Sequence, residues 1–376
     1  MLSRVYLDHN AASPVRPEAR AAMAAALEIG ANPSSVHAPG RAARAMIDDA
    51  RAQVAALAGV SADEIVFTSG ATEANNLALK GVAVERRLVS AVEHVSVLES
   101  ASNEPIPVDA RGVVDLVALT HMLAGERRPT LVSVMAANNE TGVVQPITEI
   151  ARIVHQAGAL FHCDAAQAPG RLALEPIVQA ADLISLSSPK IGGPLGVGAL
   201  VVRDGIELSA LLLGGGQERR LRAGTENLSG IVGFGAAAQA VRNDLSAASR
   251  VAALRDRLEA EALSVAAEAV VVGADAPRLA NTSALALPGI PAESQILALD
   301  LAGIAVGAGA ACSSGKIARS HVLTAMGLSD EIAMAAIRVS LSSSTTTADI
   351  DAFLVAWTDL RTRARAHRAL KPADVA

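Results

Sequence analysis

A lysine in an unusual setting is the first residue whose position could serve chemistry. Lys190 follows the apolar run 182–186 and stands in the turn 187–194, which is rich in serine, glycine and proline. Burial and nearby cations lower the pKa of an amine, and a neutral amine is a nucleophile that can hold an aldehyde cofactor as a Schiff base. An exposed turn lysine is the alternative, and the position of Lys190 taken alone favours it.

Polar side chains also follow two other apolar runs that we expect to be strands. Asp164 and Gln167 come after the run 159–163, and Asn139 follows the run 131–135. Ligands of open α/β sheets bind at the carboxyl ends of the strands. A carboxylate there can pair with a protonated pyridine nitrogen, which keeps the ring an electron sink, and the two amides can bond a ring hydroxyl. The alternatives are a helix cap or buried ion pair for Asp164 and a plain turn for Asn139.

Two further motifs stand where an expected strand meets an expected helix. The turn 69–72 consists of small residues, and its amides, together with the hydroxyl of Thr72, suit a phosphate at a helix N-terminus. His94 follows the expected strand 88–92, where it can stack on an aromatic ring or move protons near neutral pH. A purely structural histidine is the alternative for His94.

The two cysteines differ in their surroundings. Cys312 stands in the loop 309–315 of glycine, alanine and serine, where we expect it to be accessible, and Lys316 close by favours its thiolate. Cys163 lies inside an expected strand and is interpreted as a buried small hydrophobic residue. Arg338, flanked by β-branched residues, needs an anionic partner, either a substrate carboxylate or the carboxylate of a structural ion pair.

Composition limits the classes of protein to consider. The chain has 376 residues, 51% of them hydrophobic and only 2% aromatic, so small aliphatic side chains must fill a large core. The net charge of -6 and the lack of a long basic run argue against a nucleic-acid partner. No apolar stretch reaches the roughly 18–20 residues of a membrane span, and the N-terminus has no signal-peptide pattern. We therefore expect a cytoplasmic protein.

The order of the expected elements predicts an α/β fold. Between residues 65 and 202, short apolar strands alternate with amphipathic helices, which indicates a mostly parallel sheet covered on both faces. After about residue 228 an Ala-rich helical stretch over 229–263 leads into a smaller set of strands and helices. We expect a large domain over 16–247 and a smaller α/β domain made of 1–15 and 248–376.

Together these motifs resemble those of the cysteine desulfurases of the NifS and IscS kind, in the class V aminotransferase branch of fold-type I pyridoxal-phosphate enzymes. The resemblance runs nearly from end to end of the chain. The motifs that carry it are Tyr6–Ala12, Asn32–His37 with Gly40 and Arg41, Phe67–Glu73, Glu93 and His94, Asn138–Gly142, His162–Gln167, Ser187–Lys190, Gly214–Arg219, Arg222–Asn227, Ala311–Ser314, and Ile337 with Arg338. It implies a large domain with a mostly parallel seven-stranded sheet and a smaller domain that carries the cysteine loop.

The resemblance also implies the chemistry and its catalytic residues. Lys190 would bond pyridoxal 5'-phosphate and later move the α-proton of L-cysteine. Asp164 would bind the pyridine nitrogen, and His94 would stack on the ring and act in acid–base steps. Cys312 would take the sulfur, leaving alanine and a persulfide that an acceptor protein receives for iron–sulfur cluster or thio-cofactor assembly. No resident metal is implied, although Cys312 could ligate a cluster transiently.

The remaining contacts are implied in the same way. Asn139 and Gln167 would contact the ring hydroxyl. The phosphate would be held by Ala71, Thr72 and Ser187, joined by Thr225 from the neighbouring subunit of a homodimer. Asn32 and Arg338 would bind the substrate carboxylate. Many relatives carry a histidine where this chain has Pro189, which removes one expected phosphate contact and restricts the backbone there. Other possible functions are a selenocysteine lyase, another class V aminotransferase, or a partner-binding protein without catalysis.

Overall fold

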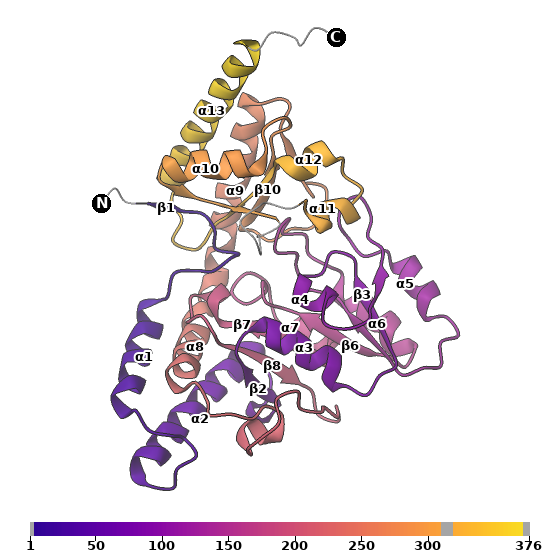
Figure 1. The fold of residues 1–376 in the computed structure, drawn as a ribbon, viewed down its shortest axis with the longest axis vertical. Helices are drawn as coiled ribbons and strands as arrows, with labels where there is room; N and C mark the ends of the chain where they lie inside the picture. The colour runs from indigo at the N-terminus through magenta and orange to yellow at the C-terminus, as the bar shows by residue number, and fades with distance from the viewer. Residues whose placement is uncertain (1–3, 310–318, 371–376) are drawn as a thin grey trace.

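The protein is described by a computed structural model over residues 4–309 and 319–370 (Figure 1). A seven-stranded sheet with its helices forms the lower part of the picture, called here the large domain. A second, mainly antiparallel group of strands and helices forms the upper part, called the small domain. The polar residues considered above are therefore positioned by two separate sheets.

The large sheet has the strand order β2-β8-β7-β6-β5-β3-β4. Only β8 runs antiparallel to its neighbours, so the prediction of a mostly parallel seven-stranded sheet is confirmed. The strands are β2 (Ile65–Thr68), β3 (Arg86–Ser90), β4 (Glu104–Ile106), β5 (Thr130–Ser133), β6 (Leu160–Asp164), β7 (Leu183–Ser187) and β8 (Gly198–Val202).

Helices cover both faces of this sheet because successive strand residues point to opposite faces. Phe67 packs into one core with the helices of the first face, whereas its neighbour Val66 packs into a second core with α3. The first face carries α1 (Pro17–Ile29), α2 (Ala38–Ala58), α5 (Leu116–Leu123), α6 (Ile147–Gln156), α7 (Glu175–Ala180) and α8 (Leu228–Val241), and the second carries α3 (Ala71–Gly81) and α4 (Val95–Leu98). Short 3-10 helices are η1 (Ala62–Glu64), η2 (Ser188–Ile191), η3 (Gln217–Arg220) and η4 (Asp244–Ala247).

The small domain has a four-stranded antiparallel sheet in the order β12-β13-β10-β9. The N-terminal strand β1 joins this domain by pairing in parallel with β11, and Leu7 lies in its core beside Trp357. The elements are β1 (Val5–Tyr6), α9 (Ala248–Val265), β9 (Val270–Val272), β10 (Thr282–Ala286), α10 (Ala292–Leu301), β11 (Ile304–Ala305), β12 (Gly307–Ala308), α11 (His321–Ala325), α12 (Asp330–Ala335), β13 (Ala336–Ser340) and α13 (Thr347–Leu370).

One expectation about the helices is wrong. The stretch 229–263 is not one helix, because α8 ends at Val241 and α9 begins at Ala248 with η4 between them. The sequence contains no proline or glycine at this break, although Asn243, a poor helix former, stands there. The break lies where the chain passes from the core of the large domain to that of the small domain, and tertiary packing of this kind leaves no local signal.

Within residues 4–309 and 319–370, no helix is both long and apolar enough to cross a membrane. In the same residues, no group of three or more histidine, cysteine, aspartate or glutamate side chains is placed to hold a metal ion. Cys163 is fully buried, as expected, and burial raises the pKa of its thiol well above the usual value. It is therefore a packing residue of β6.

Candidate active site

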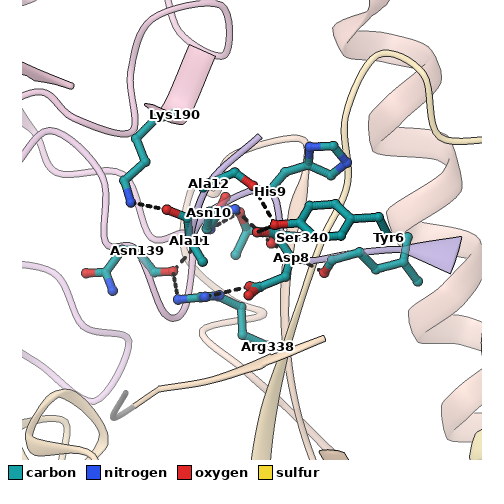
Figure 2. A network of polar contacts seen from close by, with 12 residues as sticks. Tyr6, Asp8, His9, Asn10, Ala11, Ala12, Asn139, Lys190, Arg338 and Ser340 are labelled. Atoms are coloured by element: carbon teal, nitrogen blue, oxygen red, sulfur yellow. Dashed lines mark hydrogen bonds and ion pairs between the residues drawn. The ribbon is translucent and has the colours of Figure 1, made fainter. Parts of the chain in front are cut away.

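Lys190 lies at the carboxyl end of β7, inside η2, and faces the small domain (Figure 2). Its Nζ donates a hydrogen bond to the backbone carbonyl of Ala11. Burial lowers the pKa of the amine to about 8, helped by the positive charges of Arg338 and Arg171 and opposed by Asp164. The amine is therefore neutral in part at neutral pH, which makes it a nucleophile and not a solvated surface charge.

Asp164 ends β6, next to β7, and is almost fully buried. Its Oδ1 accepts a hydrogen bond from the backbone N–H of Ala166 at 2.9 Å, and its Oδ2 accepts one from Nδ2 of Asn75 at 2.7 Å. Asn75 is fully buried on α3 and was not predicted, although a polar residue between buried positions of a helix is a signal that could have found it. Two donors thus fix the carboxylate at the strand end.

His94 is connected to Asp164 through the same asparagine. Nδ2 of Asn75 also donates to Oγ of Ser96 at 2.9 Å, and that hydroxyl lies 2.8 Å from Nδ1 of His94. The backbone N–H of Ser96 donates to the same Nδ1 at 3.1 Å, so the neutral ring carries its proton on Nε2. Burial lowers the pKa of His94; Lys190 lowers it further, while Asp164 opposes the shift. The histidine is held as a neutral imidazole.

The residues expected to bind a phosphate meet at one corner of the sheet. Gly198 pairs with Thr68 of β2 on one side and with Ser187 of β7 on the other, so Ser187 lies close to the turn that starts α3. This turn brings Ala71 and Thr72 to the N-terminus of α3, where backbone N–H groups are free to bind an anion. A side chain at Gly198 would collide with the backbone of Gly70, which explains the glycine there.

The structure also describes Thr225, which was expected to bind a phosphate from the neighbouring subunit. It is exposed in the segment after η3, and Arg222 ties this segment to Glu73 of α3 through an Nε–Oε1 contact of 3.0 Å. A left-handed backbone at Glu218, Arg219 and Arg220 turns the segment, held by a buried bidentate ion pair between Glu218 and Arg51.

Arg338 lies on β13 and reaches across to the large domain. Its Nη2 donates to Oδ1 of Asp8 at 2.7 Å, and its Nη1 donates to the backbone carbonyl of Asn139 at 3.2 Å (Figure 2). The buried Nε has no partner among the described residues. The alternative of an ion pair is thus realised in this structure, and the open Nε leaves the guanidinium one buried donor for a further anion.

Asn10 joins the elements of the site and was not singled out from the sequence. Its Nδ2 donates to the carbonyl of Asn139 at 3.1 Å and to Oγ1 of Thr282 at 3.0 Å, and its carbonyl accepts from Nε2 of Gln167 at 3.0 Å. Oε1 of Gln167 accepts from Arg171. Both ends of the Gln167 amide therefore bond to the protein, and its contact with a ring hydroxyl stays a prediction.

Asn32 is not brought together with Arg338. It is exposed in the connection between α1 and α2, where its Oδ1 accepts from the backbone N–H of Ser34 at 2.8 Å. That connection lies at the lower end of the large domain, away from the strands of the small domain (Figure 1). Its Oδ1 stabilises a local turn, so a substrate contact from the same chain is not supported.

Cys312 and Lys316 lie outside the described residues. The described chain stops at Gly309 after β12 and resumes at Arg319 before α11. Both sides of this gap meet Glu140 in the turn after β5: Oγ of Ser320 donates to its Oε2 at 2.5 Å, and any side chain at Gly309 would collide with the same carboxylate. Gly309 and Ser320, the described residues near the two ends of the gap, therefore both lie beside Glu140, and Arg338 lines the same small cavity.

A cavity of about 310 Å³ also reaches Lys190 from the side of Arg16 and Asp244. Lys190 and His9 line it, whereas Asp164 and His94 do not. The carboxyl edge of the sheet holds Lys190, Asp164, His94 and the N-terminus of α3. This set fits pyridoxal 5'-phosphate, since it offers an amine for the aldehyde, an anion for the ring nitrogen and N–H donors for the phosphate.

Comparison with known proteins supports this assignment. The model of the family described as "Aminotransferase class-V" matches residues 5–353. A cysteine desulfurase of Cereibacter sphaeroides is 44% identical over 370 residues, covering 94% of each chain, and "Cysteine desulfurase IscS 1" of Archaeoglobus fulgidus is 40% identical, covering 93% of this chain and 94% of that one. A NifS-like protein of Rickettsia africae superposes with a TM-score of 0.87 at 35% identity over 96% of this chain and 99% of the other. The chain therefore belongs to the class V aminotransferase family and, within it, to the cysteine desulfurases.

Proposed function

We propose that the protein removes sulfur from L-cysteine with the help of pyridoxal 5'-phosphate, leaving L-alanine and a persulfide on Cys312. The observation that carries this proposal is the Lys190 amine, whose pKa is lowered to about 8 at the strand edge that also holds Asp164 and His94. Family membership adds the reaction type, and the sequence adds the thiol.

The cofactor, when bonded to the substrate amine, supplies an electron sink that weakens the bonds at the α and β carbons of the amino acid. The Asp164 carboxylate, fixed by Asn75 and Ala166, supports the protonated ring nitrogen that such a sink requires. The Lys190 amine takes the α-proton, because it is neutral in part near pH 8. His94 donates a proton from Nε2, since its Nδ1 already accepts a hydrogen bond from the backbone N–H of Ser96.

The sulfur step balances without an external oxidant. The Cys312 thiolate forms an S–S bond with the substrate sulfur while the C–S bond breaks, and the electron pair of that bond stays with the substrate carbon, which is then protonated to alanine. Cysteine and the enzyme thiol thus become alanine and the enzyme persulfide. Arg338 binds the substrate carboxylate through the N–H groups of its guanidinium. Without substrate, Asp8 is the anion that occupies this guanidinium and so competes with the substrate.

We also propose that the protein works as a homodimer in which Thr225 binds the phosphate held by the partner subunit. Leu211, Leu212 and Leu213 are 40%, 47% and 85% exposed, and the backbone N–H of Ala223 donates to the carbonyl of Leu212, which places them beside the segment of Thr225. Large apolar side chains gathered on one surface are typical of an interface. A substrate contact by Asn32 would then come from the partner subunit.

The persulfide sulfur would pass to an acceptor or scaffold protein for iron–sulfur cluster or thio-cofactor assembly, in the cytoplasm. A selenocysteine lyase or a transaminase of the same family would use the same cofactor residues, so Cys312 is the residue that separates these functions.

The test incubates the cofactor-loaded protein with L-cysteine and measures alanine and sulfide. We expect equal amounts of both with a thiol reductant present, and neither from Cys312→Ala. Unchanged turnover in that variant contradicts the proposal, and a requirement for a keto acid indicates a transaminase. A strong preference for selenocysteine indicates the lyase, and absence of any turnover indicates a partner-binding protein.

A further inference from the structure

Glu140 occupies a position that the proposed reaction does not explain. It belongs to the turn 138–142 of the large domain, directly after Asn139, and is 4% exposed. Its backbone N–H donates to Oδ1 of Asn138 at 2.9 Å, and Nδ2 of Asn138 donates to the carbonyl of Val92 at 2.9 Å. The carboxylate is therefore carried by a rigid, buried turn.

One oxygen of this carboxylate lies against a residue on each side of the segment that contains Cys312. Ser320, which also caps α11 by accepting from the N–H of Leu323, donates its Oγ proton to Oε2 of Glu140 at 2.5 Å. On the other side, Gly309 approaches so closely that any Cβ there would collide with the same Oε2. The two contacts come from parts of the small domain that are separated by ten residues of sequence, 310–319.

We propose that Glu140 is a positioning residue for the sulfur-transfer step, which fixes where the segment carrying Cys312 leaves β12 and where it enters α11. This inference rests on the proposed function, because it concerns the reach of the Cys312 thiol. A nucleophile acts at full rate only when its geometry is held closely, and a displacement of about 1 Å can cost about 100-fold in rate.

The surroundings of Glu140 suit such a role. Burial raises the pKa of its carboxyl, while Ser320, His321 and Arg338 oppose the shift. An amide that accepts from Ser320 can therefore replace the carboxyl. The start of α11 also has a second tie to the large domain, since Nε2 of His321 donates to the carbonyl of Glu93 at 2.8 Å. Truncation of Glu140 should thus loosen Gly309 and Ser320 without detaching α11.

The experiment compares Glu140→Ala, Glu140→Gln and Ser320→Ala in the cofactor-loaded full chain. Two steps are measured separately: the change in cofactor absorbance on adding L-cysteine, which does not need the thiol, and the single-turnover rate at which Cys312 gains one sulfur atom, followed by mass spectrometry. We expect Glu140→Ala to bind L-cysteine with unchanged affinity and to form the persulfide about 10- to 100-fold more slowly. Glu140→Gln should recover most of the rate.

Ser329→Ala is the matched control, because Ser329 caps α12 as Ser320 caps α11 but has no described contact with Glu140. It should leave both steps unchanged. If Glu140→Ala does not fold, Ser320→Ala removes the same hydrogen bond from the other side and carries the test. Persulfide rates within about two-fold of the parent in all variants, or parallel loss of cysteine binding and persulfide formation, would overturn the inference. If the parent itself forms no persulfide, the proposed function fails instead.

Discussion

Nδ2 of Asn75 lies 2.7 Å from Oδ2 of Asp164, and the same nitrogen lies 2.9 Å from Oγ of Ser96. One buried amide on α3 therefore fixes both the carboxylate expected at the ring nitrogen and the hydroxyl that sets the proton of His94. The three residues belong to α3, β6 and α4, so a single side chain connects Asp164 to the hydrogen-bond partner of His94.

Removal of this amide should weaken cofactor binding. In Asn75→Ala, Asp164 keeps only the N–H of Ala166, so we expect pyridoxal 5'-phosphate to bind about 10-fold more weakly and stability to fall by about 1–3 kcal/mol. An absorbance titration of the cofactor-free protein measures the first effect and urea unfolding the second. Asn103→Ala is the control, since its Nδ2 likewise makes two hydrogen bonds, here to the backbone carbonyls of Val97 and Leu98, but does not contact Asp164. Equal cofactor affinity in both variants would contradict the assignment.

The lowered pKa of Lys190 predicts the pH dependence of cofactor uptake. The neutral amine attacks the aldehyde, and its fraction rises with pH through the pKa of about 8. The rate of uptake by the cofactor-free protein should therefore increase from pH 6.5 to 8 and level off about one unit above 8. Borohydride trapping at successive pH values measures it. A midpoint near the ordinary lysine pKa of about 10.4 would show that Lys190 is solvated.

Arg338 and Asp8 allow a test of substrate recognition. If Arg338 binds the carboxylate of L-cysteine, Arg338→Gln should weaken L-cysteine binding by about 10-fold or more but leave cysteamine, which lacks that carboxylate, unaffected. Asp8→Asn should preserve or tighten L-cysteine binding, because it removes the competing anion that now lies 2.7 Å from Nη2. Absorbance titration with the two ligands gives both answers. An equal loss of affinity for both ligands in Arg338→Gln would show that Arg338 serves only as the partner of Asp8 in a structural ion pair.

The buried pair of Glu218 and Arg51 should be worth far more than a surface pair. Glu218→Ala leaves Arg51 buried without its partner and frees the left-handed turn 218–220, so we expect a loss of about 3–5 kcal/mol in the free energy of unfolding. Asp351→Ala, which removes an exposed pair with Arg257, should cost less than about 1 kcal/mol. Denaturant unfolding compares the two, and similar losses would show that burial does not set the strength of the pair.

The parts of the site that the sequence predicted are those that follow from strand order. Lys190 and Asp164 were expected at one edge because neighbouring parallel strands end together, and their strands do pair. Asn10 and Asn75 were missed, since their partners come from distant parts of the chain. The antiparallel direction of β8 was equally hidden, because the pattern of apolar residues in a strand buried on both faces is the same in either direction.

The substrate contact expected of Asn32 stays a prediction. Its motif matches the family, yet in this chain the side chain closes its own turn at a distance from Arg338. A motif specifies a residue type and a spacing along the sequence, but it does not state whether the partner belongs to the same chain. Contacts between subunits are therefore the part of the site that one sequence predicts least well.

The pairing of the N-terminal segment with the last strands has a consequence for synthesis on the ribosome. The backbone N–H of Leu7 donates to the carbonyl of Ala305, and that of Ser340 donates to the carbonyl of Leu7, so Leu7 can make these bonds only after about 300 further residues have been synthesised. Asn10 and Ala11 reach Lys190 and Asn139 only as part of this segment. A nascent chain can thus complete its large sheet while Lys190 still lacks its contact with the segment of Asn10 and Ala11, which is fixed in place only after β11 and β13 have been synthesised.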